Sequence, residues 1–279
     1  MNINQLELID FLMEVESLYG YNFVSYNHNT LKRRISSHAI KLRVSSFEEY
    51  SRLVLSNKKY FKGMFGYFSI NVTEFFREPK QLKIFRENML EYLKTYSHIK
   101  IWYAGCSTGE TVYSLAMLLD EMGLLNRVQI YATDFNNKVL VKAKEGLYEL
   151  NDFGQIKDNY ELSGGRYSFD KYFIKQGKYL QIKSYLKNHI LFFNHNLTTD
   201  GIINEFNLVI CKNVFIYFNT DLKQKVLNLF LDSLKTKGFL ILGENEYLNK
   251  GFEKTLKNYI PNSKIYQKRL QKEERITCK

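Results

Sequence analysis

The sequence predicts a doubly wound α/β domain preceded by a smaller all-α N-terminal domain. In the N-terminal part of the chain, apolar residues recur at the spacing of amphipathic helices. Beyond His98, short runs rich in β-branched and aromatic residues alternate with helical stretches, as in a parallel sheet with crossover helices. With 279 residues, 45% of them hydrophobic, the chain can form one large and one small core. We expect the helical domain to cover residues 1–67 and the α/β domain residues 68–279.

Three amphipathic helices are expected in the N-terminal domain. The first covers residues 5–18, where apolar side chains recur every third position. The second begins after Asn29 or Thr30, and its apolar face consists of Leu31, Ile35, Ala39 and Leu42. The third begins at Ser46, because Ser46 and Glu49 form the S-x-x-E pattern of a capping box, in which each side chain can bond a free backbone amide.

The elements of the α/β domain follow in order along the chain. The predicted strands cover residues 99–104, 128–133, 190–194, 206–211, 238–243 and 264–268. The predicted helices between them cover residues 110–122, 137–144 and 220–234. The segment 167–187 instead alternates apolar with polar and basic residues, so we expect a small antiparallel β-subdomain there.

Charge and hydropathy limit the class of protein. The formal net charge of +11 favours an acidic or polyanionic partner, such as nucleic acid, an anionic membrane surface or a protein surface dense in Glu and Asp. No apolar run approaches the roughly 18 residues that a membrane-spanning helix needs. The acidic residues Glu7 and Asp10 stand where a signal peptide would carry lysines. We therefore expect a cytoplasmic protein without membrane insertion.

The cysteines indicate neither a disulfide framework nor a metal site. Cys106, Cys211 and Cys278 are scattered along the chain, and none has the C-x-x-C spacing of a metal ligand pair. We expect three free thiols and no bound metal.

A small-residue loop follows the first predicted strand. It reads Gly-Cys-Ser-Thr-Gly-Glu from Gly105 to Glu110, and its small residues let the backbone approach a ligand at a helix N-terminus. A tight turn with no ligand would show the same pattern. Asp134 ends the next strand, where a carboxylate can accept both ribose hydroxyls of an adenosyl cofactor. Alternatively, Asp134 caps the helix that begins near Asn136.

The loop lacks the G-x-G-x-x-G pattern of dinucleotide enzymes, so a nucleoside cofactor without a pyrophosphate is favoured. Four motifs make the reading more specific. N-V-T-E-F-F-R-E (71–78), G-C-S-T-G-E (105–110), N-H-N-L (194–197) and C-K-N-V-F-I-Y-F (211–218) occur in this order. They resemble the corresponding motifs of the chemotaxis-receptor methyltransferases, the CheR family.

The resemblance implies a Rossmann-like methyltransferase domain that binds S-adenosylmethionine and esterifies glutamate side chains of bacterial chemoreceptors, with S-adenosylhomocysteine as the second product. The cofactor-binding residues that it implies are Asn71, Thr73, Arg77, Gly105, Glu110, Thr111, Asp134, Asn196, Leu197, Asn213 and Val214. Arg77 and Tyr217 are implied as the catalytic pair beside the transferring methyl group. Taken alone, Arg77 could be a surface cation and Tyr217 a buried aromatic residue.

The chain departs from the family pattern at one position that matters for the cofactor. The family usually has S-T-G-E-E, and the second glutamate faces the ammonium group of the methyl donor; here Thr111 stands in its place. Threonine brings no charge, and charge-assisted hydrogen bonds are roughly twice as strong as neutral ones. The alternative function is therefore a CheR-like binding or scaffold protein with weak or lost turnover. Glu244 or Glu246 could compensate for the missing carboxylate.

A basic helix indicates the partner. Arg34, His38 and Lys41 lie at i, i+4 and i+7, with Lys32 and Arg33 nearby. A solvated helix face is the simplest reading of such a charge run. The resemblance implies instead that this helix meets the acidic, glutamate-rich methylation helices of chemoreceptors, where complementary charge steers the encounter.

Two other partners are not expected. The turn near residues 175–178 is shorter than in the family members that bind a receptor-tail peptide, so we expect no such peptide here. A nucleic-acid methyltransferase is disfavoured, because residues 213–216 read N-V-F-I where base N-methyltransferases tend to carry N-P-P-Y, and no RNA-binding module is visible.

Overall fold

The computed structural model describes residues 1–68, 73–149, 153–248 and 251–270. The chain forms two compact units, each built from two stretches of sequence. The first comprises Met1–Asn71 and Val214–Val226, and the second comprises Val72–Asn213 and Leu227–Lys279. Among the described residues, no helix is both long and apolar enough to cross a lipid bilayer.

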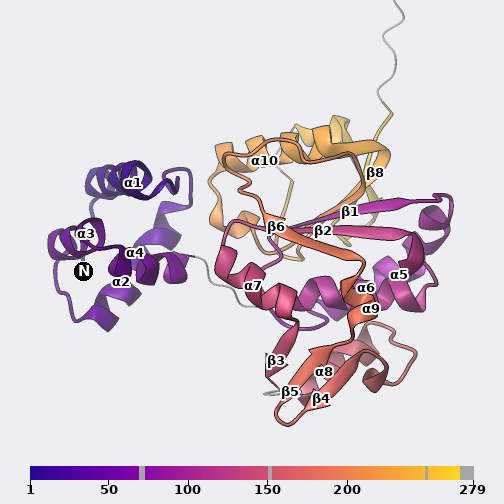
Figure 1. The fold of residues 1–279 in the computed structure, drawn as a ribbon. Helices are drawn as coiled ribbons and strands as arrows, with labels where there is room; N and C mark the ends of the chain where they lie inside the picture. The colour runs from indigo at the N-terminus through magenta and orange to yellow at the C-terminus, as the bar shows by residue number, and fades with distance from the viewer. Residues whose placement is uncertain (69–72, 150–152, 249–250, 271–279) are drawn as a thin grey trace, which may run out of the picture. The chain divides into compact units, whose positions relative to one another are not determined.

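The first unit is helical, which confirms the predicted all-α N-terminal domain (Figure 1). Its helices are α1 (Gln5–Tyr19), α2 (His28–Leu42), α3 (Phe47–Ser56) and α4 (Lys58–Phe68), to which the later stretch adds η3 (Phe215–Tyr217) and the start of α10 (Thr220–Ser233). As the capping pattern predicts, the Ser46 hydroxyl accepts a hydrogen bond from the Glu49 amide at 3.1 Å. Aromatic rings fill much of the core, and Tyr19 stacks on Phe61 with ring centroids 3.9 Å apart.

The basic residues of α2 divide between the surface and the core. Arg33 and Lys41 are exposed and Lys32 is half-buried, whereas Arg34 and His38 keep only 6% and 3% of their surface accessible. The prediction of one continuous cationic flank is therefore wrong for Arg34 and His38. Both turn inward because their polar atoms find partners inside the unit, a backbone carbonyl at the end of α4 and a hydroxyl on α3.

The second unit contains the seven-stranded sheet of the predicted doubly wound domain, in the order β6-β2-β1-β7-β8-β10-β9. The strands are β1 (Ile99–Ala104), β2 (Val128–Asp134), β6 (Ile190–Asn194), β7 (Phe206–Cys211), β8 (Leu234–Leu242), β9 (Leu256–Ile260) and β10 (Ile265–Lys268). The pairs from β6 to β8 are parallel, and β10 runs antiparallel to β8 and β9. The Rossmann-like fold class is confirmed. Strand β9 was not predicted; of its residues only Leu256 is buried.

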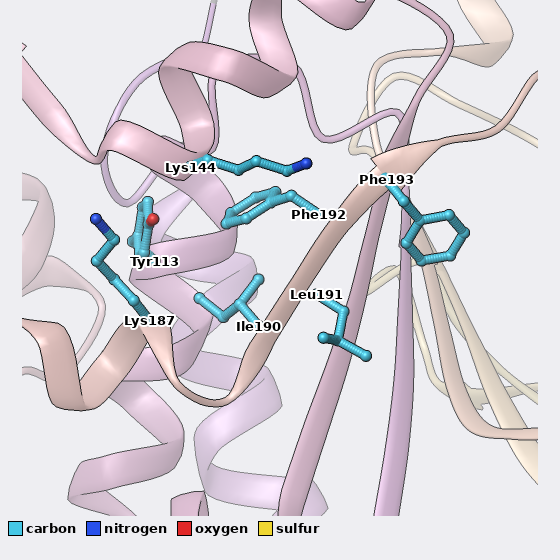
Figure 2. Close-up of a pocket in the computed structure, with 7 residues that line it drawn as sticks. All are labelled: Tyr113, Lys144, Lys187, Ile190, Leu191, Phe192 and Phe193. Atoms are coloured by element: carbon cyan, nitrogen blue, oxygen red, sulfur yellow. The ribbon is translucent and has the colours of Figure 1, made fainter.

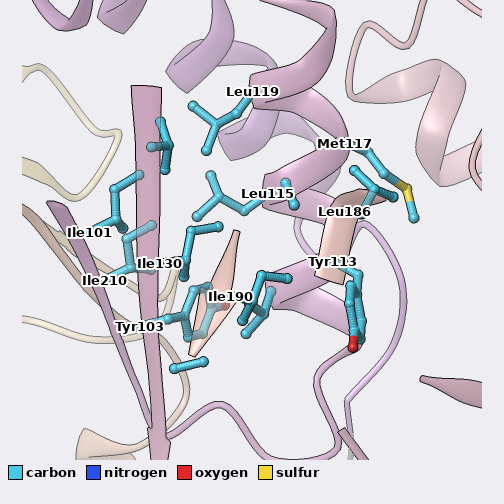
Figure 3. Close-up of a cluster of buried hydrophobic side chains, with 14 of the residues drawn as sticks. Ile101, Tyr103, Tyr113, Leu115, Met117, Leu119, Ile130, Leu186, Ile190 and Ile210 are labelled. Carbon is cyan, nitrogen blue, oxygen red and sulfur yellow. The ribbon is translucent and has the colours of Figure 1, made fainter. Parts of the chain in front are cut away.

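Most helices of the second unit lie along this sheet, whereas α8 (Phe153–Leu162) lies beside the small sheet described below (Figure 1). The helices of this unit are α5 (Pro79–Lys94), α6 (Glu110–Glu121), α7 (Asn137–Glu145), α8, α9 (Ser184–Lys187) and the end of α10, with short 3-10 turns η1 (Leu125–Arg127), η2 (Phe169–Lys171) and η4 (Phe252–Lys254). Helix α6 is almost entirely buried because its apolar residues occur on every side. Figure 3 shows Leu115 and Leu119 of α6 near Ile101 and Ile130 of the sheet.

A small antiparallel sheet confirms the predicted β-subdomain. Its strands are β3 (Leu147–Glu149), β4 (Phe173–Gln176) and β5 (Tyr179–Ile182), in the order β3-β5-β4. The sequence predicted the part that contains β4 and β5 but not β3, which is too short to show alternation. Gln176 pairs with Tyr179 across a two-residue turn, where Gly177 has a φ of 59°.

Candidate active site

The motif at residues 105–110 forms the loop between β1 and α6. Gly105 and Gly109 have φ values of 76° and 95°, in the region that favours glycine. A Cβ atom at Gly109 would lie 3.0 Å from the Cβ of Ala143, so both conformation and space require glycine there. The Gly105 amide donates to the carbonyl of Thr133 at 2.8 Å, which fixes the loop at the carboxyl edge of the sheet.

Asp134 closes this loop from the end of β2. Its Oδ2 accepts the amide of Ser107 and its Oδ1 the amide of Asn136, each at 2.9 Å. Burial raises the pKa of Asp134, although these backbone amides oppose the rise. The N-cap of α7 is Asn136, whose side chain accepts the amide of Lys138, so the alternative in which Asp134 caps this helix is wrong.

The two residues after Gly109 have different partners. Glu110 accepts the Thr108 hydroxyl at 2.7 Å. Burial raises the pKa of Glu110 to about 6, although the hydrogen bond from Thr108 opposes the rise. Thr111 shares a side-chain hydrogen bond with the hydroxyl of Tyr103 on β1. The Glu110 carboxylate therefore bonds within the loop, whereas the Thr111 hydroxyl bonds strand β1.

Two motifs that are distant in sequence meet through Arg77 and Asn213. The Nη2 of Arg77 donates to Oδ1 of Asn213 at 3.0 Å, and Nδ2 of Asn213 donates to Oε1 of Glu78 at 3.2 Å. Asn213 has a φ of 62°, and its backbone amide donates to Oε2 of Glu246 at 2.9 Å. A donor on one side and an acceptor on the other fix the orientation of the Asn213 amide, which in turn orients Arg77.

A buried ion pair supports this contact. The Nζ of Lys212 lies 2.8 Å from Oε2 of Glu78, with 6% and 10% of the two side chains exposed. Burial alone would raise the pKa of Glu78, but the charge of Lys212 and the hydrogen bonds from Lys212 and Asn213 outweigh it, so the pKa is lowered and the carboxylate is ionised. Glu78 and Tyr103 were not among the predicted site residues. The one signal for Glu78 was its position beside Arg77 in the motif.

The remaining predicted residues are dispersed. Leu197 is buried after β6, and Oδ1 of Asn196 accepts both the amide and the hydroxyl of Thr198, at 3.0 and 2.9 Å. The Asn196 side chain thus stabilises the turn that follows β6. Asn71 lies outside the described residues.

Val214 and Tyr217 belong to the first unit. The guanidinium of buried Arg34 lies 4.5 Å from the centroid of the Tyr217 ring, and Arg34 also donates to the carbonyl of Phe68. The Tyr217 carbonyl accepts the amide of Asn27 at 2.8 Å. These contacts anchor Tyr217 within its own unit. That Tyr217 and Arg77 flank one methyl group stays a prediction.

The second unit offers polar groups that fit an adenosyl amino-acid cofactor. Within the described part of the chain, Thr73 Oγ1 and Ser107 Oγ are buried side-chain atoms without a hydrogen-bond partner. Buried polar groups nearly always have partners, so a ligand with hydroxyl, ammonium or carboxylate groups would satisfy them. Thr73 belongs to the same motif as Arg77, and Ser107 belongs to the loop whose amide Asp134 accepts, which is where such a cofactor is expected.

A separate pocket of about 420 Å³ lies against the edge strand β6 (Figure 2). It is lined by Tyr113, Lys144, Lys187, Ile190, Leu191, Phe192 and Phe193. Its floor is apolar, with the two lysines flanking it. None of the residues that the motifs single out belongs to this lining, so the pocket is not part of the candidate active site.

Comparison with known families gives the decisive observation. Residues 71–264 match the SAM-binding domain of the CheR methyltransferases, and residues 6–69 match their all-α domain. The chain belongs to the CheR methyltransferase family. The match to the SAM-binding domain identifies S-adenosylmethionine as the methyl donor.

Relatives from several bacteria resemble this member of the CheR family over most of their length. The Pseudomonas putida protein named "Putative methyltransferase Cher3" is 40% identical over 245 residues, covering 85% of this chain and 88% of the relative. A chemotaxis protein methyltransferase of Borreliella burgdorferi is 30% identical over 273 residues, covering 91% of this chain and 93% of the relative. That of Listeria innocua is 28% identical over 240 residues, covering 85% and 88%.

Proposed function

We propose that the protein transfers the methyl group of S-adenosylmethionine to glutamate side chains of bacterial chemoreceptors, giving glutamate γ-methyl esters and S-adenosylhomocysteine. The contact between Arg77 and Asn213 carries the proposal, because it joins two motifs whose residues are 136 positions apart. Strands β1 and β7 are parallel neighbours, with Ala104 opposite Cys211, so the glycine loop and Asn213 leave the sheet at the same edge. Ligands of such sheets bind at this edge, which supports a role for the Arg77 cation beside the acceptor.

The acceptor requires alignment more than activation. A glutamate carboxylate is ionised at neutral pH and is a competent nucleophile, so no general base is needed. When bound, S-adenosylmethionine supplies an electrophilic methyl group, and the carboxylate oxygen bonds to that carbon as its bond to sulfur breaks. Arg77, oriented by Asn213, attracts and desolvates the acceptor. Each oxygen of Asp134 keeps a lone pair beyond its backbone bond and can accept a ribose hydroxyl.

Labelled methyl transfer to a receptor cytoplasmic fragment tests this function. With a tritiated methyl donor we expect base-labile label on the fragment, lost when its methylation glutamates are replaced by alanine. Arg77→Ala should lower turnover by about 100-fold, a typical cost of removing one electrostatic contact to the reacting group. Arg166→Ala, which alters an exposed arginine of the same unit, should leave turnover unchanged. An Arg77→Ala enzyme with full turnover would remove Arg77 from the site.

The second candidate function is a binding or scaffold protein, and Thr111 is the observation that favours it. Without a carboxylate at this position, cofactor affinity could be too low for turnover. Calorimetric titration with S-adenosylhomocysteine separates the two functions. Tight binding together with methyl transfer supports the enzyme, whereas no binding at millimolar ligand supports the scaffold.

We also propose that the acidic helices of a receptor dock in the cytoplasm on the exposed basic residues of α2, which are Arg33 and Lys41 with the neighbouring Lys32. Reversing these three charges to glutamate should slow methylation most at low salt, because screening weakens long-range attraction. A matched reversal at the three exposed residues Lys58, Lys59 and Lys62 of α4 should have little effect. Equal effects of both sets would indicate a nonspecific dependence on net charge.

The short turn between β4 and β5 supports a further part of the proposal, that no receptor-tail peptide is used. Deleting the extreme C-terminus of the receptor should leave the methylation rate unchanged as long as the methylation helices are intact. A loss of methylation on that deletion would refute this part of the proposal and leave the reaction itself untouched.

A further inference from the structure

The family pattern implies that position 111 faces the ammonium group of the methyl donor, and Thr111 offers that group no carboxylate partner. The residue lies in the first turn of α6 and carries no charge. An ammonium group that is removed from water needs an opposite charge and hydrogen-bond acceptors to offset its lost hydration. Another acidic residue close to Thr111 is therefore required for firm binding of the donor.

The partner of Thr111 is the hydroxyl of Tyr103, which reaches it from β1. Tyr103 is buried with 3% of its surface exposed, and burial raises its pKa, so it is a neutral phenol at physiological pH. Two hydroxyls that share one hydrogen bond still have free lone pairs, which can accept the N–H groups of an ammonium. They provide hydrogen-bond acceptors at this point but no negative charge.

The charge lies beside them on Glu78. Tyr103 of β1 is paired with Ile210 of β7, and β7 leads directly into Lys212 and Asn213. Those two residues hold the Glu78 carboxylate, at 2.8 and 3.2 Å. Glu78 is also close enough for its charge to act on the Tyr103 phenol. The carboxylate, the phenol and the Thr111 hydroxyl thus gather at the carboxyl ends of two neighbouring strands.

The other carboxylates of the region have different tasks. Glu110 accepts the Thr108 hydroxyl and interacts with Lys142 of α7. One oxygen of Glu246 accepts two backbone amides, at 2.7 and 2.9 Å, which shapes the Asn213 loop. Asp134 accepts the amide of Ser107 in the loop after β1 and that of Asn136 at the start of α7, and it is the expected ribose ligand. Of these carboxylates, Glu78 is thus the one that acts on Tyr103, the hydrogen-bond partner of Thr111.

If the protein binds S-adenosylmethionine as proposed above, we infer that Glu78, with the hydroxyls of Tyr103 and Thr111, receives the ammonium group of the donor. Glu78 then replaces the carboxylate that position 111 lacks. Its oxygens can accept about four hydrogen bonds, so the pair with Lys212, the bond from Asn213 and the backbone bond from Glu244 leave about one position for the ligand. Glu78, the residue next to Arg77, thus supplies the negative charge that Thr111 lacks, and Glu244 and Glu246 do not.

Calorimetry with two ligands tests this inference on the full chain. S-adenosylhomocysteine carries the ammonium group, and 5′-methylthioadenosine shares the adenosyl thioether but lacks the amino acid. We expect Glu78→Gln to weaken S-adenosylhomocysteine by about 10- to 100-fold, the size of a charge-assisted hydrogen bond. Binding of 5′-methylthioadenosine should change by less than about twofold. Adding Thr111→Glu to this variant should restore the affinity for S-adenosylhomocysteine.

Two further variants separate recognition from folding. Glu244→Gln removes an exposed carboxylate that acts on the same Lys212, and it should leave both affinities unchanged. Glu78→Gln with Lys212→Met leaves no buried unpaired charge. It should keep the thermal stability of the unaltered chain and still bind S-adenosylhomocysteine weakly.

The outcomes are distinct. Unchanged S-adenosylhomocysteine binding in Glu78→Gln, or an equal loss of both ligands, would overturn the inference and leave the proposed function intact. If neither ligand binds the unaltered chain, the proposed function falls and the inference falls with it.

Discussion

The carboxylate of Glu121, in the last turn of α6, connects several parts of the second unit. Its Oε2 lies 2.6 Å from Nη1 of Arg86 and accepts the backbone amide of Arg166 at 3.0 Å. Its Oε1 accepts the hydroxyl of Tyr172 at 2.9 Å and that of Tyr160. The Glu121 side chain is fully buried and that of Arg86 is 6% exposed. We predict that Glu121→Ala strongly destabilises this unit, because the guanidinium would remain buried without its counter-charge.

The expected loss is about 4 kcal/mol, within the range of roughly 3–5 kcal/mol for breaking one side of a buried ion pair. The control is Glu161→Ala, which removes an exposed ion pair. The Oε1 of Glu161 lies 3.8 Å from Nζ of Lys157, and 62% and 58% of the two side chains are exposed. An exposed pair of this kind contributes less than about 1 kcal/mol. Replacing the buried pair with Arg86→Met and Glu121→Gln together should recover part of the loss, since no unpaired charge remains and the glutamine carbonyl can still accept a tyrosine hydroxyl.

Urea unfolding followed by tryptophan fluorescence measures these differences. Trp102 is the one tryptophan of the chain and lies buried in β1, so its emission reports the second unit specifically. The reasoning would be refuted if Glu121→Ala lowered the free energy of unfolding by less than about 1 kcal/mol, as the Glu161 control does. The buried Arg86 would then tolerate the loss of its counter-charge.

Three shorter predictions concern the loop after β1 and helix α2. Because the pKa of Glu110 is raised to about 6 in the folded chain, ionising it opposes folding, so stability should fall by about 1 kcal/mol as pH rises from 4.5 to 6, out of about 2 kcal/mol over the whole titration, and Glu110→Gln should abolish that step in urea titrations at the two pH values. Gly109→Ala should cost about 1–3 kcal/mol in the same assay, because φ is 95° and the added methyl would meet Ala143; a neutral effect would show that the loop relaxes freely. Arg34→Gln should lower the melting temperature of the first unit by several degrees by circular dichroism, whereas Arg33→Gln on its exposed side should not; equal melting temperatures would mean that the buried guanidinium contributes nothing.

The parallel strands could be predicted from sequence because buried strands leave continuous apolar runs. Every predicted strand of the large sheet is present, and β1, β6 and β7 begin and end as predicted. Strand β9 was not predicted, because it is an edge strand with one buried residue and therefore has no apolar run. Strand β3 is too short to show a period. Both misses arise because tertiary pairing, not local pattern, creates these strands.

Sequence motifs indicated which residues form the site but not which partners they choose. Arg77 and Asn213 were singled out separately, and their hydrogen bond could not be read from either motif. Tyr103 was seen only as part of a strand, because its contact with Thr111 depends on how α6 lies over β1. Arg34 and His38 were misread because helical spacing identifies a shared face without showing whether solvent or protein covers it.

The return of residues 214–226 to the first unit limits how this protein can be divided. The carbonyl of Tyr217 bonds the amide of Asn27, and Phe218 forms a bridge with Tyr26, so this late stretch completes an assembly begun at the N-terminus. The C-K-N-V-F-I-Y-F motif is split between the two units after Asn213. Removing the residues before Val72 would therefore leave residues 214–218 of this motif without the helices on which they pack. An exchange of the helical unit between relatives would therefore have to include residues 214–226.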